Sequence, residues 1–180
     1  NVLLELIDNI TNLSRLESES YELTIAEFDL NELVNQLYND YIDQFKEKSI
    51  KLTMSKTQLD PMIISADQQL LFLTFNQLIQ NALKYTSEGE VTFGYQMKQI
   101  DEKLQMICFV KDSGIGMSEE DLNQVFKRFI KIEDNNRKLY RGAGIGLALC
   151  QRTVQLLSGK IWINSELKKG TTVNFTFNSY

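Results

Sequence analysis

The chain has 180 residues, of which 43% are hydrophobic, and it contains nine glycines and a single proline. This composition indicates one globular core and excludes a disordered or fibrous chain as the first interpretation. A net charge of −5 disfavours nucleic acid and acidic membrane surfaces as partners, because both attract basic proteins.

The cysteines, the absence of histidine and the lack of a long apolar run narrow the class of protein further. Cys108 lies in a strand-like segment and Cys150 in a helix-like one, without CxxC spacing, so we expect reduced, buried thiols. The absence of histidine weakens a zinc or iron hypothesis. No run of about 18 apolar residues is present, so we expect a cytoplasmic domain, and anchoring of a parent protein in the inner membrane stays open. Because the sequence opens at Asn1 without a leader segment, we interpret it as part of a longer protein.

The first segment, 2–18, has the pattern of an amphipathic helix. Its apolar residues follow heptad-like spacing and form one stripe: Leu3, Leu6, Ile7, Ile10, Leu13 and Leu16. Such a stripe needs a partner, which is either the core of the downstream domain or another chain. We expect residues 19–28 to be a short link.

Three longer helices are expected downstream, over about 29–46, 68–85 and 145–158. Asp29 with Glu32 resembles an acidic capping box at the first, and Asp67 is expected to cap the second. Gly159 is expected to stop the third.

Short segments between the helices are predicted to be strands: 50–54, 62–65, 91–98, 104–111, 160–165 and 171–178. A turn is expected at Asp60-Pro61, and Ser118 with Asp121 opens a short helix that ends near Phe126. The last four strands form two hairpins. One layer of helices on one mostly antiparallel sheet is the economical arrangement, so we predict an α+β two-layer sandwich.

Four residues at one end of the second long helix carry the first candidate site. Gln77, Asn81, Lys84 and Tyr85 are spaced to lie around that end. An Asn oxygen can bind Mg²⁺, a lysine can meet phosphate, and a tyrosine offers a flat surface to a base. Taken alone, these residues also fit the polar face of an ordinary amphipathic helix.

Two glycine-containing segments carry the second and third candidate sites. Asp112-x-Gly114-x-Gly116 follows a strand, where a carboxylate can accept a hydrogen bond from an exocyclic amine and glycines let the backbone approach a ligand. Gly142-x-Gly144-x-Gly146 precedes a helix, and its free N–H groups would form an anion cradle. A turn and a flexible hinge are the respective alternatives, and the second segment matches neither the P-loop nor the Rossmann spacing.

Basic residues gather between the two glycine segments. Six of the 19 lysines and arginines fall within 127–141. A solvated loop explains such a run in isolation.

In this order, the segments resemble the catalytic and ATP-binding domain of sensor histidine kinases, in the superfamily of gyrase, Hsp90 and MutL ATPases with the Bergerat fold. Five segments resemble the family's N, G1, F, G2 and final boxes: 77–86, 112–116, 126–129, 142–146 and 170–171. Residues 13–17 and 28–30 resemble the end of the dimerisation helix and its exit. The resemblance therefore implies a dimerisation-helix remnant at 1–20 and a catalytic domain at 21–180.

The resemblance also implies a binding site for ATP and Mg²⁺. Asn81 would bind Mg²⁺, Asp112 the adenine amine, and residues 130–141 would form a lid. The implied nucleotide-binding residues are Asn81, Lys84, Tyr85, Asp112, Gly114, Gly116, Gly142, Gly144, Gly146 and Thr171.

Two departures from the family pattern shape the functional hypothesis. Gln77 stands where many histidine kinases have Asn and where hydrolytic relatives carry a general-base Glu, and an amide cannot take up a proton as a carboxylate does. This argues against a gyrase-like or Hsp90-like ATPase. The chain also has no histidine, so no phosphoacceptor or other catalytic residue is assigned within it.

The resemblance thus implies transfer of the ATP γ-phosphate to a histidine on a helix outside this chain. It further implies a homodimeric parent and a response-regulator receiver domain as partner. The alternative is a non-catalytic module that senses a nucleotide and changes the conformation of 1–18.

Overall fold

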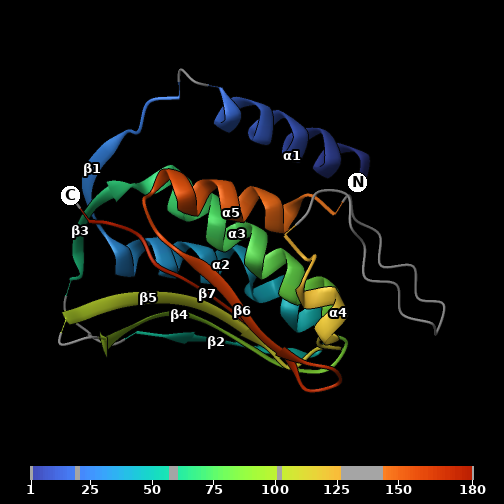
Figure 1. Ribbon diagram of the computed structural model, residues 1–180. Coiled ribbons are helices and arrows are strands. Elements are labelled where there is room, and N and C mark those ends of the chain that lie inside the picture. Colours follow the sequence, from blue (N-terminus) through green and yellow to red (C-terminus); the bar gives the residue numbers. More distant parts are fainter. Residues whose placement is uncertain (1, 19–20, 57–60, 101–102, 127–143, 180) are drawn as a thin grey trace.

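The computed structural model describes residues 2–18, 21–56, 61–100, 103–126 and 144–179 (Figure 1). The expected turn at Asp60-Pro61, most of the F box, the basic stretch, its lid and Gly142 lie outside the described residues, apart from Pro61 and Phe126 at their edges.

A five-stranded sheet forms one layer of the molecule. Its order is β2-β4-β5-β7-β6, and the strands are β2 (Ile50–Ser55), β4 (Gly89–Ile100), β5 (Lys103–Asp112), β6 (Ile161–Glu166) and β7 (Gly170–Phe175). The two predicted hairpins, β4–β5 and β6–β7, are confirmed as antiparallel pairs. β2 pairs in parallel with β4, because the chain returns to the sheet through a helix before β4 begins.

A separate two-stranded ribbon joins β1 (Ile25–Asp29) to β3 (Ile63–Asp67). The expectation that 19–28 is only a link is therefore wrong at its end. The exposure of β1 does not alternate along the strand, so the sequence lacks the period that identifies a half-buried strand. Asp29 and Asp67 lie at the ends of the ribbon strands, where their carboxylates accept N–H groups of Asn31 at 2.9 Å and of Leu70 at 3.1 Å. Both predicted helix caps are confirmed.

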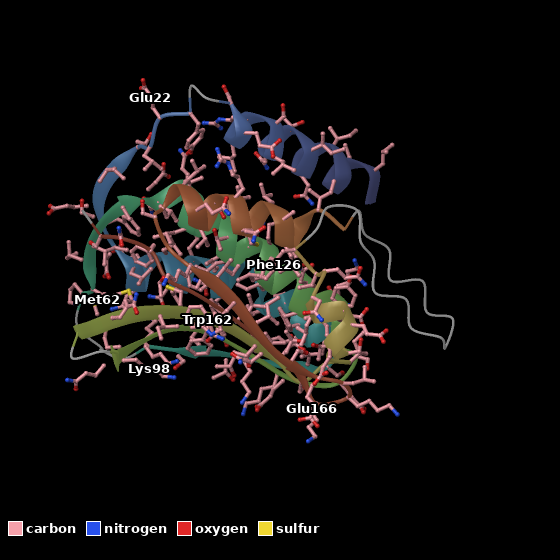
Figure 2. All side chains as sticks on the ribbon, in the orientation of Figure 1. Glu22, Met62, Lys98, Phe126, Trp162 and Glu166 are labelled. Carbon is pink, nitrogen blue, oxygen red and sulfur yellow. The ribbon has the colours of Figure 1, made fainter. Side chains whose placement is uncertain are left out.

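Helices form the second layer, on one face of the sheet (Figure 1). They are α2 (Leu30–Glu47), α3 (Gln68–Tyr85), the short α4 (Glu119–Leu122) and α5 (Gly146–Leu156). Side chains fill the space between the layers (Figure 2), and the largest that are fully buried are aromatic: Phe45, Phe75, Phe93, Tyr95 and Phe175. The predicted α+β sandwich is confirmed. In this arrangement the polar C-terminal end of α3 lies over the carboxyl end of β5.

The N-terminal helix α1 (Val2–Glu17) lies against α5, outside the two layers (Figure 1). Leu13 and Leu16 are buried there, and Arg152 Nε donates a 2.9 Å hydrogen bond to the Leu16 carbonyl. Four other apolar residues of the predicted stripe or beside it are exposed: Leu3, Leu4, Ile7 and Ile10. Only the C-terminal part of the apolar stripe of α1 is therefore buried against α5. None of the helices in the described ranges combines the length and apolar content needed to cross a membrane.

Candidate functional site

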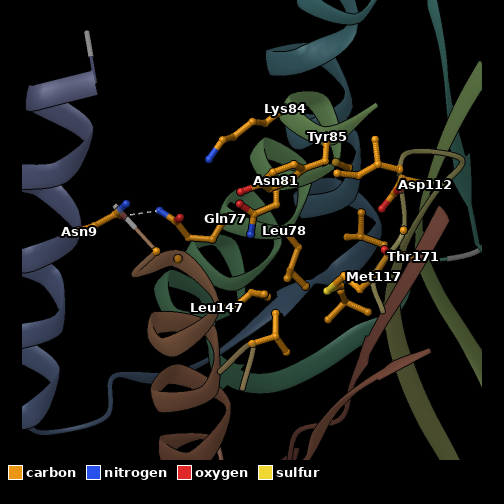
Figure 3. A pocket seen from close by; sticks show the side chains of 18 residues that line it. Asn9, Gln77, Leu78, Asn81, Lys84, Tyr85, Asp112, Met117, Leu147 and Thr171 are labelled. Atoms are coloured by element: carbon orange, nitrogen blue, oxygen red, sulfur yellow. Dashed lines mark hydrogen bonds between the residues drawn. The ribbon is translucent and has the colours of Figure 1, made fainter. Parts of the chain in front are cut away.

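A pocket opens at the C-terminal end of α3, between the helices and the sheet (Figure 3). Nine residues noted in the sequence line it: Gln77, Asn81, Lys84, Tyr85, Asp112, Gly116, Gly144, Gly146 and Thr171. Gly114 lies next to Asp112 but is not part of the lining, and Gly142 is outside the described residues. Segments separated by up to about half of the chain therefore converge on one cavity.

The pocket has two chemically different ends. In Figure 3 the amides of Gln77 and Asn81 lie toward α1 and the start of α5, whereas Asp112 and Thr171 lie on the opposite side. Apolar side chains, among them Leu78, Met117 and Leu147, line the space between and below them. Val173 adds to the apolar lining. A ligand with one flat apolar part and one polar or anionic part matches this division.

Asp112 is the last residue of β5, and its carboxylate is largely removed from water. Burial raises the pKa of the Asp112 carboxyl, and the backbone N–H groups of Gly114 and Thr171 oppose that rise by donating to the carboxylate. The Gly114 bond to Oδ1 is 2.8 Å long. Asp112 and Thr171 face each other across the β5–β7 ladder, so the sheet fixes both residues at the same depth of the pocket.

The glycines after Asp112 serve the packing of the protein itself. A Cβ at Gly114 would collide with the Tyr85 carbonyl oxygen, and one at Gly116 would collide with the Glu166 carbonyl oxygen. Gly116 also has φ +65°, a conformation that glycine adopts without strain. These glycines let the loop press against the end of α3 and the β6–β7 turn. They shape the pocket wall by that contact. Their expected role in admitting a ligand stays a prediction.

Lys84 and Tyr85 form the edge of the pocket at the end of α3. The Lys84 ammonium lies 4.6 Å from the centroid of the Tyr85 ring, within the range of a cation–π interaction. Both side chains are half-buried. The positive charge is therefore held at the mouth rather than projecting freely into solvent.

The start of α5 faces the amide end of the pocket. Ile145 occupies the N-cap position, and no side chain of the described residues caps the helix. Gly144 has φ +67°, and Gly146 is the first helical residue. The first turn of a helix has N–H groups without intrahelical partners, and its dipole favours a negative charge. This arrangement can bind an anion.

Gln77 is connected to α1 by a buried hydrogen bond. Its Nε2 donates to Asn9 Oδ1 at 2.7 Å, and both residues are almost completely buried. Asn9 lines the same pocket, although sequence reasoning did not select it. The signal was weak but present, because positions 9, 13 and 16 lie on one helical face, and Leu13 and Leu16 are the residues that α1 buries.

A metal ion in this pocket would have few protein ligands. Within the described part of the chain, no group of three or more Asp, Glu, Cys or His residues is arranged to hold one. Asn81, half-buried at the amide end, offers one neutral oxygen. Such a donor set fits Mg²⁺, which commonly takes one or two protein ligands together with phosphates and water.

Comparison of this chain with known proteins leads to the same family that the order of the sequence motifs indicates. A family model described as histidine kinase-, DNA gyrase B-, and HSP90-like ATPase matches residues 66–180, from the end of β3 through α3 and both glycine segments. This chain belongs to that ATPase family. Within the family it is an ATP-binding catalytic domain of the sensor histidine kinase type.

Relatives of this histidine kinase type match nearly the whole chain. The autoinducer 2 sensor kinase/phosphatase LuxQ of Vibrio cholerae is 31% identical over 169 residues, which are 94% of this chain and 20% of that protein. The sensor histidine kinase WalK of Bacillus subtilis is 30% identical over 97% of this chain and 28% of its own length. The chain therefore spans well under half of these relatives.

Solved structures share the fold. Full-length ShkA in complex with AMPPNP superposes with a TM-score of 0.80 at 24% identity, covering 99% of this chain and 37% of that one. The histidine kinase ThkA, in complex with the response regulator protein TrrA, superposes with a TM-score of 0.73 at 22% identity, covering 99% and 49%. At these identities the likeness establishes the fold alone.

Proposed function

We propose that this histidine kinase-type domain binds Mg–ATP in the pocket around Asn81 and Asp112 and donates the γ-phosphate to a histidine outside this chain. One observation carries the proposal, namely the convergence of Asn81, Asp112 and the Gly144–Gly146 turn on a single cavity. These residues come from three separate elements, and each supplies chemistry that a different part of the nucleotide requires.

The Asp112 end receives the adenine. The carboxylate accepts a hydrogen bond from the exocyclic amine, and Leu78, Met117 and Val173 supply apolar contacts to the ring. Thr171, beside Asp112, adds a hydroxyl that already shares a 2.8 Å hydrogen bond with Ser165. Tyr85 lies at the mouth, where its ring covers the base.

The amide end receives the phosphates and Mg²⁺. Asn81 would provide an oxygen ligand to Mg²⁺, and the ion would supply positive charge that offsets the charge of the phosphates. The first turn of α5, which no side chain of the described residues caps, binds phosphate through its N–H groups, and Gly144 and Gly146 leave that backbone accessible. Gly142, outside the described residues, stays a predicted member of the same cradle. Lys84 contributes a positive charge near the phosphate chain.

Gln77 supports transfer to a protein acceptor over hydrolysis. The buried amide already donates to Asn9, and an amide is too weak a base to activate water. A nucleophile must then reach the γ-phosphate from outside the pocket. We propose that residues 1–20 continue a dimerisation hairpin that carries this histidine, that the parent is a homodimer, and that a response-regulator receiver domain takes up the phosphate. The relatives named as histidine kinases, and the ThkA complex with TrrA, support this assignment.

Phosphotransfer to the parent's own helical segment tests the proposal. The chain is mixed with γ-labelled Mg–ATP and with the longer parent protein, whose own pocket is weakened by Asp112→Asn. A reaction without this chain measures the label that the parent adds to itself, and only label above that level counts. Acid-labile, base-stable label on the parent supports the kinase. Tight nucleotide binding without transfer supports the alternative, a domain that senses the nucleotide through α1. Failure of this chain to bind Mg–ATP contradicts both.

A further inference from the structure

The amide end of the pocket is completed by a residue that lies outside the matched family region. Asn9 belongs to α1, whereas the family model begins at residue 66. Asn9 is nevertheless 4% exposed and lines the pocket together with Asn81 and Gly146 (Figure 3). The candidate nucleotide site therefore has one wall that the catalytic domain does not supply.

The contact between α1 and the pocket passes through Gln77. Gln77 Nε2 donates to Asn9 Oδ1 at 2.7 Å, and Gln77 is itself 6% exposed. The other atom of the same amide, Oε1, faces α5, where it would lie only 3.0 Å from a Cβ added at Gly146. One amide thus bonds to α1 and lies beside the first helical residue of α5. A rotation of the Gln77 amide, or the departure of Asn9, changes the group presented to the phosphate cradle.

We propose that Asn9 is a positioning residue for the nucleotide site, which fixes the Gln77 amide beside the first turn of α5 and thereby couples Mg–nucleotide binding to the docking of α1. This inference rests on the proposed function, because it assigns the amide end to the phosphates. The coupling follows from burial. When α1 leaves, Gln77 loses its partner and faces solvent or a changed cavity, so the pocket that binds phosphate best is the one with α1 docked.

The neighbouring contacts of α1 locate the coupling at Asn9. Leu13 and Leu16 pack against α5 through apolar surface, and Arg152 bonds only to the Leu16 backbone. These contacts hold the helix in place but do not line the nucleotide pocket. Among the described residues of α1, only Asn9 both contacts the rest of the domain and lines the nucleotide pocket.

A double-mutant cycle in nucleotide affinity tests the proposal. Mg–ATP and adenosine affinities are measured by calorimetry for the wild type, Asn9→Ala, Gln77→Ala and the double variant, with Thr11→Ala, at an exposed position of α1, as the matched control. Loss of one buried hydrogen bond predicts about five-fold weaker Mg–ATP binding for Asn9→Ala. Adenosine affinity and the Thr11→Ala variant stay at wild-type values. The double variant binds no more weakly than Gln77→Ala, because Asn9 acts through Gln77.

A second measurement follows from the reciprocity of coupled binding. If docked α1 favours Mg–ATP, then Mg–ATP favours docked α1 by the same factor. Saturating nucleotide should therefore slow amide hydrogen exchange in residues 9–16 of the wild type and change it little in Asn9→Ala. A purely structural role for Asn9 would alter exchange equally with and without nucleotide.

The outcomes separate this inference from the function on which it rests. Wild-type binding of Mg–ATP, with unchanged affinity in Asn9→Ala or with fully additive losses in the cycle, overturns the positioning role and leaves the proposed function intact. Exchange in α1 that ignores nucleotide in the wild type overturns the coupling. Absence of Mg–ATP binding by the wild type overturns the proposed function itself.

Discussion

Asp112 Oδ1 accepts a 2.8 Å hydrogen bond from the backbone N–H of Gly114, two residues further along the chain. The bond curls the loop after β5 back onto the carboxylate, and the missing Cβ of Gly114 lets the same loop contact the Tyr85 carbonyl. One acidic side chain therefore sets the shape of the pocket floor, where it also accepts the Thr171 N–H, and in the proposed function it accepts a hydrogen bond from the adenine. Replacing that side chain tests both roles.

Asp112→Asn should weaken adenine-nucleotide binding by about 1–3 kcal/mol, because the neutral amide is a poorer acceptor than a carboxylate for the exocyclic amine. Calorimetric titration with ATP, ADP and adenosine measures the loss, which should be similar for all three since each carries the same base. Asp40→Asn, at an exposed position of α2, is the control. Equal affinities of wild type and Asp112→Asn would show that the adenine binds elsewhere.

The pH dependence of stability should carry the signature of Asp112. Burial raises the pKa of this carboxyl above its ordinary value, so between the two values the folded state holds more protons than the unfolded state. The unfolding free energy contributed by Asp112 then falls as pH rises through that window, and is lowest at neutral pH. Asn carries no charge at any pH. We therefore expect Asp112→Asn to be more stable than wild type at pH 7, with a difference that shrinks toward acidic pH.

Denaturant titrations of both proteins across the acidic range measure this difference. The same charge governs ligand binding, so adenosine affinity of the wild type should fall on acidification, beginning above the ordinary titration range of an aspartate. The affinity of Asp112→Asn should stay level over that range. A stability difference that grows toward acidic pH would contradict the assigned direction of the pKa shift.

Asn81→Ala should separate the two ends of the pocket. Loss of an oxygen that contacts a charged group predicts a decrease of about 1.5–3 kcal/mol in Mg–ATP affinity, whereas adenosine affinity should not change. Titrations with and without Mg²⁺ measure the effect, and the advantage conferred by Mg²⁺ in the wild type should disappear in the variant. Asn35→Ala, at an exposed position of α2, controls for a general effect of removing an amide. Retention of the full Mg²⁺ dependence would remove Asn81 from the metal site.

The sequence identifies features that are local and misses those that depend on tertiary contacts. Asp29 and Asp67 are recognisable as helix caps because a cap is a short-range pattern of side chain and backbone. β1 was missed because the exposure of this strand does not alternate along its residues. The pairing partner of β2 could not be read either, since a parallel neighbour is separated by a helix in the chain.

The candidate site shows the same division. Asp112 and Asn81 were found because their motifs are short and ordered along the chain. Asn9 was missed because its role arises only when α1 docks, and a single Asn on an amphipathic helix has no distinguishing spacing. For Gly114 the structure adds a packing reason that the motif does not reveal, since a Cβ there would collide with the Tyr85 carbonyl oxygen. Contacts between elements remote in sequence decide both the role of Asn9 and the packing of Gly114.

Gly146→Ala should leave the stability of the fold unchanged and weaken the binding of Mg–ATP. Alanine is a better helix former than glycine, so α5 should not lose stability. The alanine Cβ would lie 3.0 Å from Gln77 Oε1, which is closer than an ordinary van der Waals contact. It would lie 3.6 Å from Asn81 Nδ2, which is an ordinary contact distance. The Gln77 amide is held on its other side by Asn9 and cannot withdraw without breaking that bond.

The methyl group should therefore narrow the phosphate cradle while leaving the Asp112 end unchanged. We expect thermal unfolding of Gly146→Ala without nucleotide to match the wild type, Mg–ATP affinity to fall by about tenfold, or 1.4 kcal/mol, and adenosine affinity to persist. The control is Ala148→Ser, two residues after Gly146 in α5 and outside the lining of this pocket. Equal losses for Mg–ATP and adenosine would mean that the added methyl disturbs the whole domain, whereas a selective loss for the triphosphate locates the anion site at the first turn of α5.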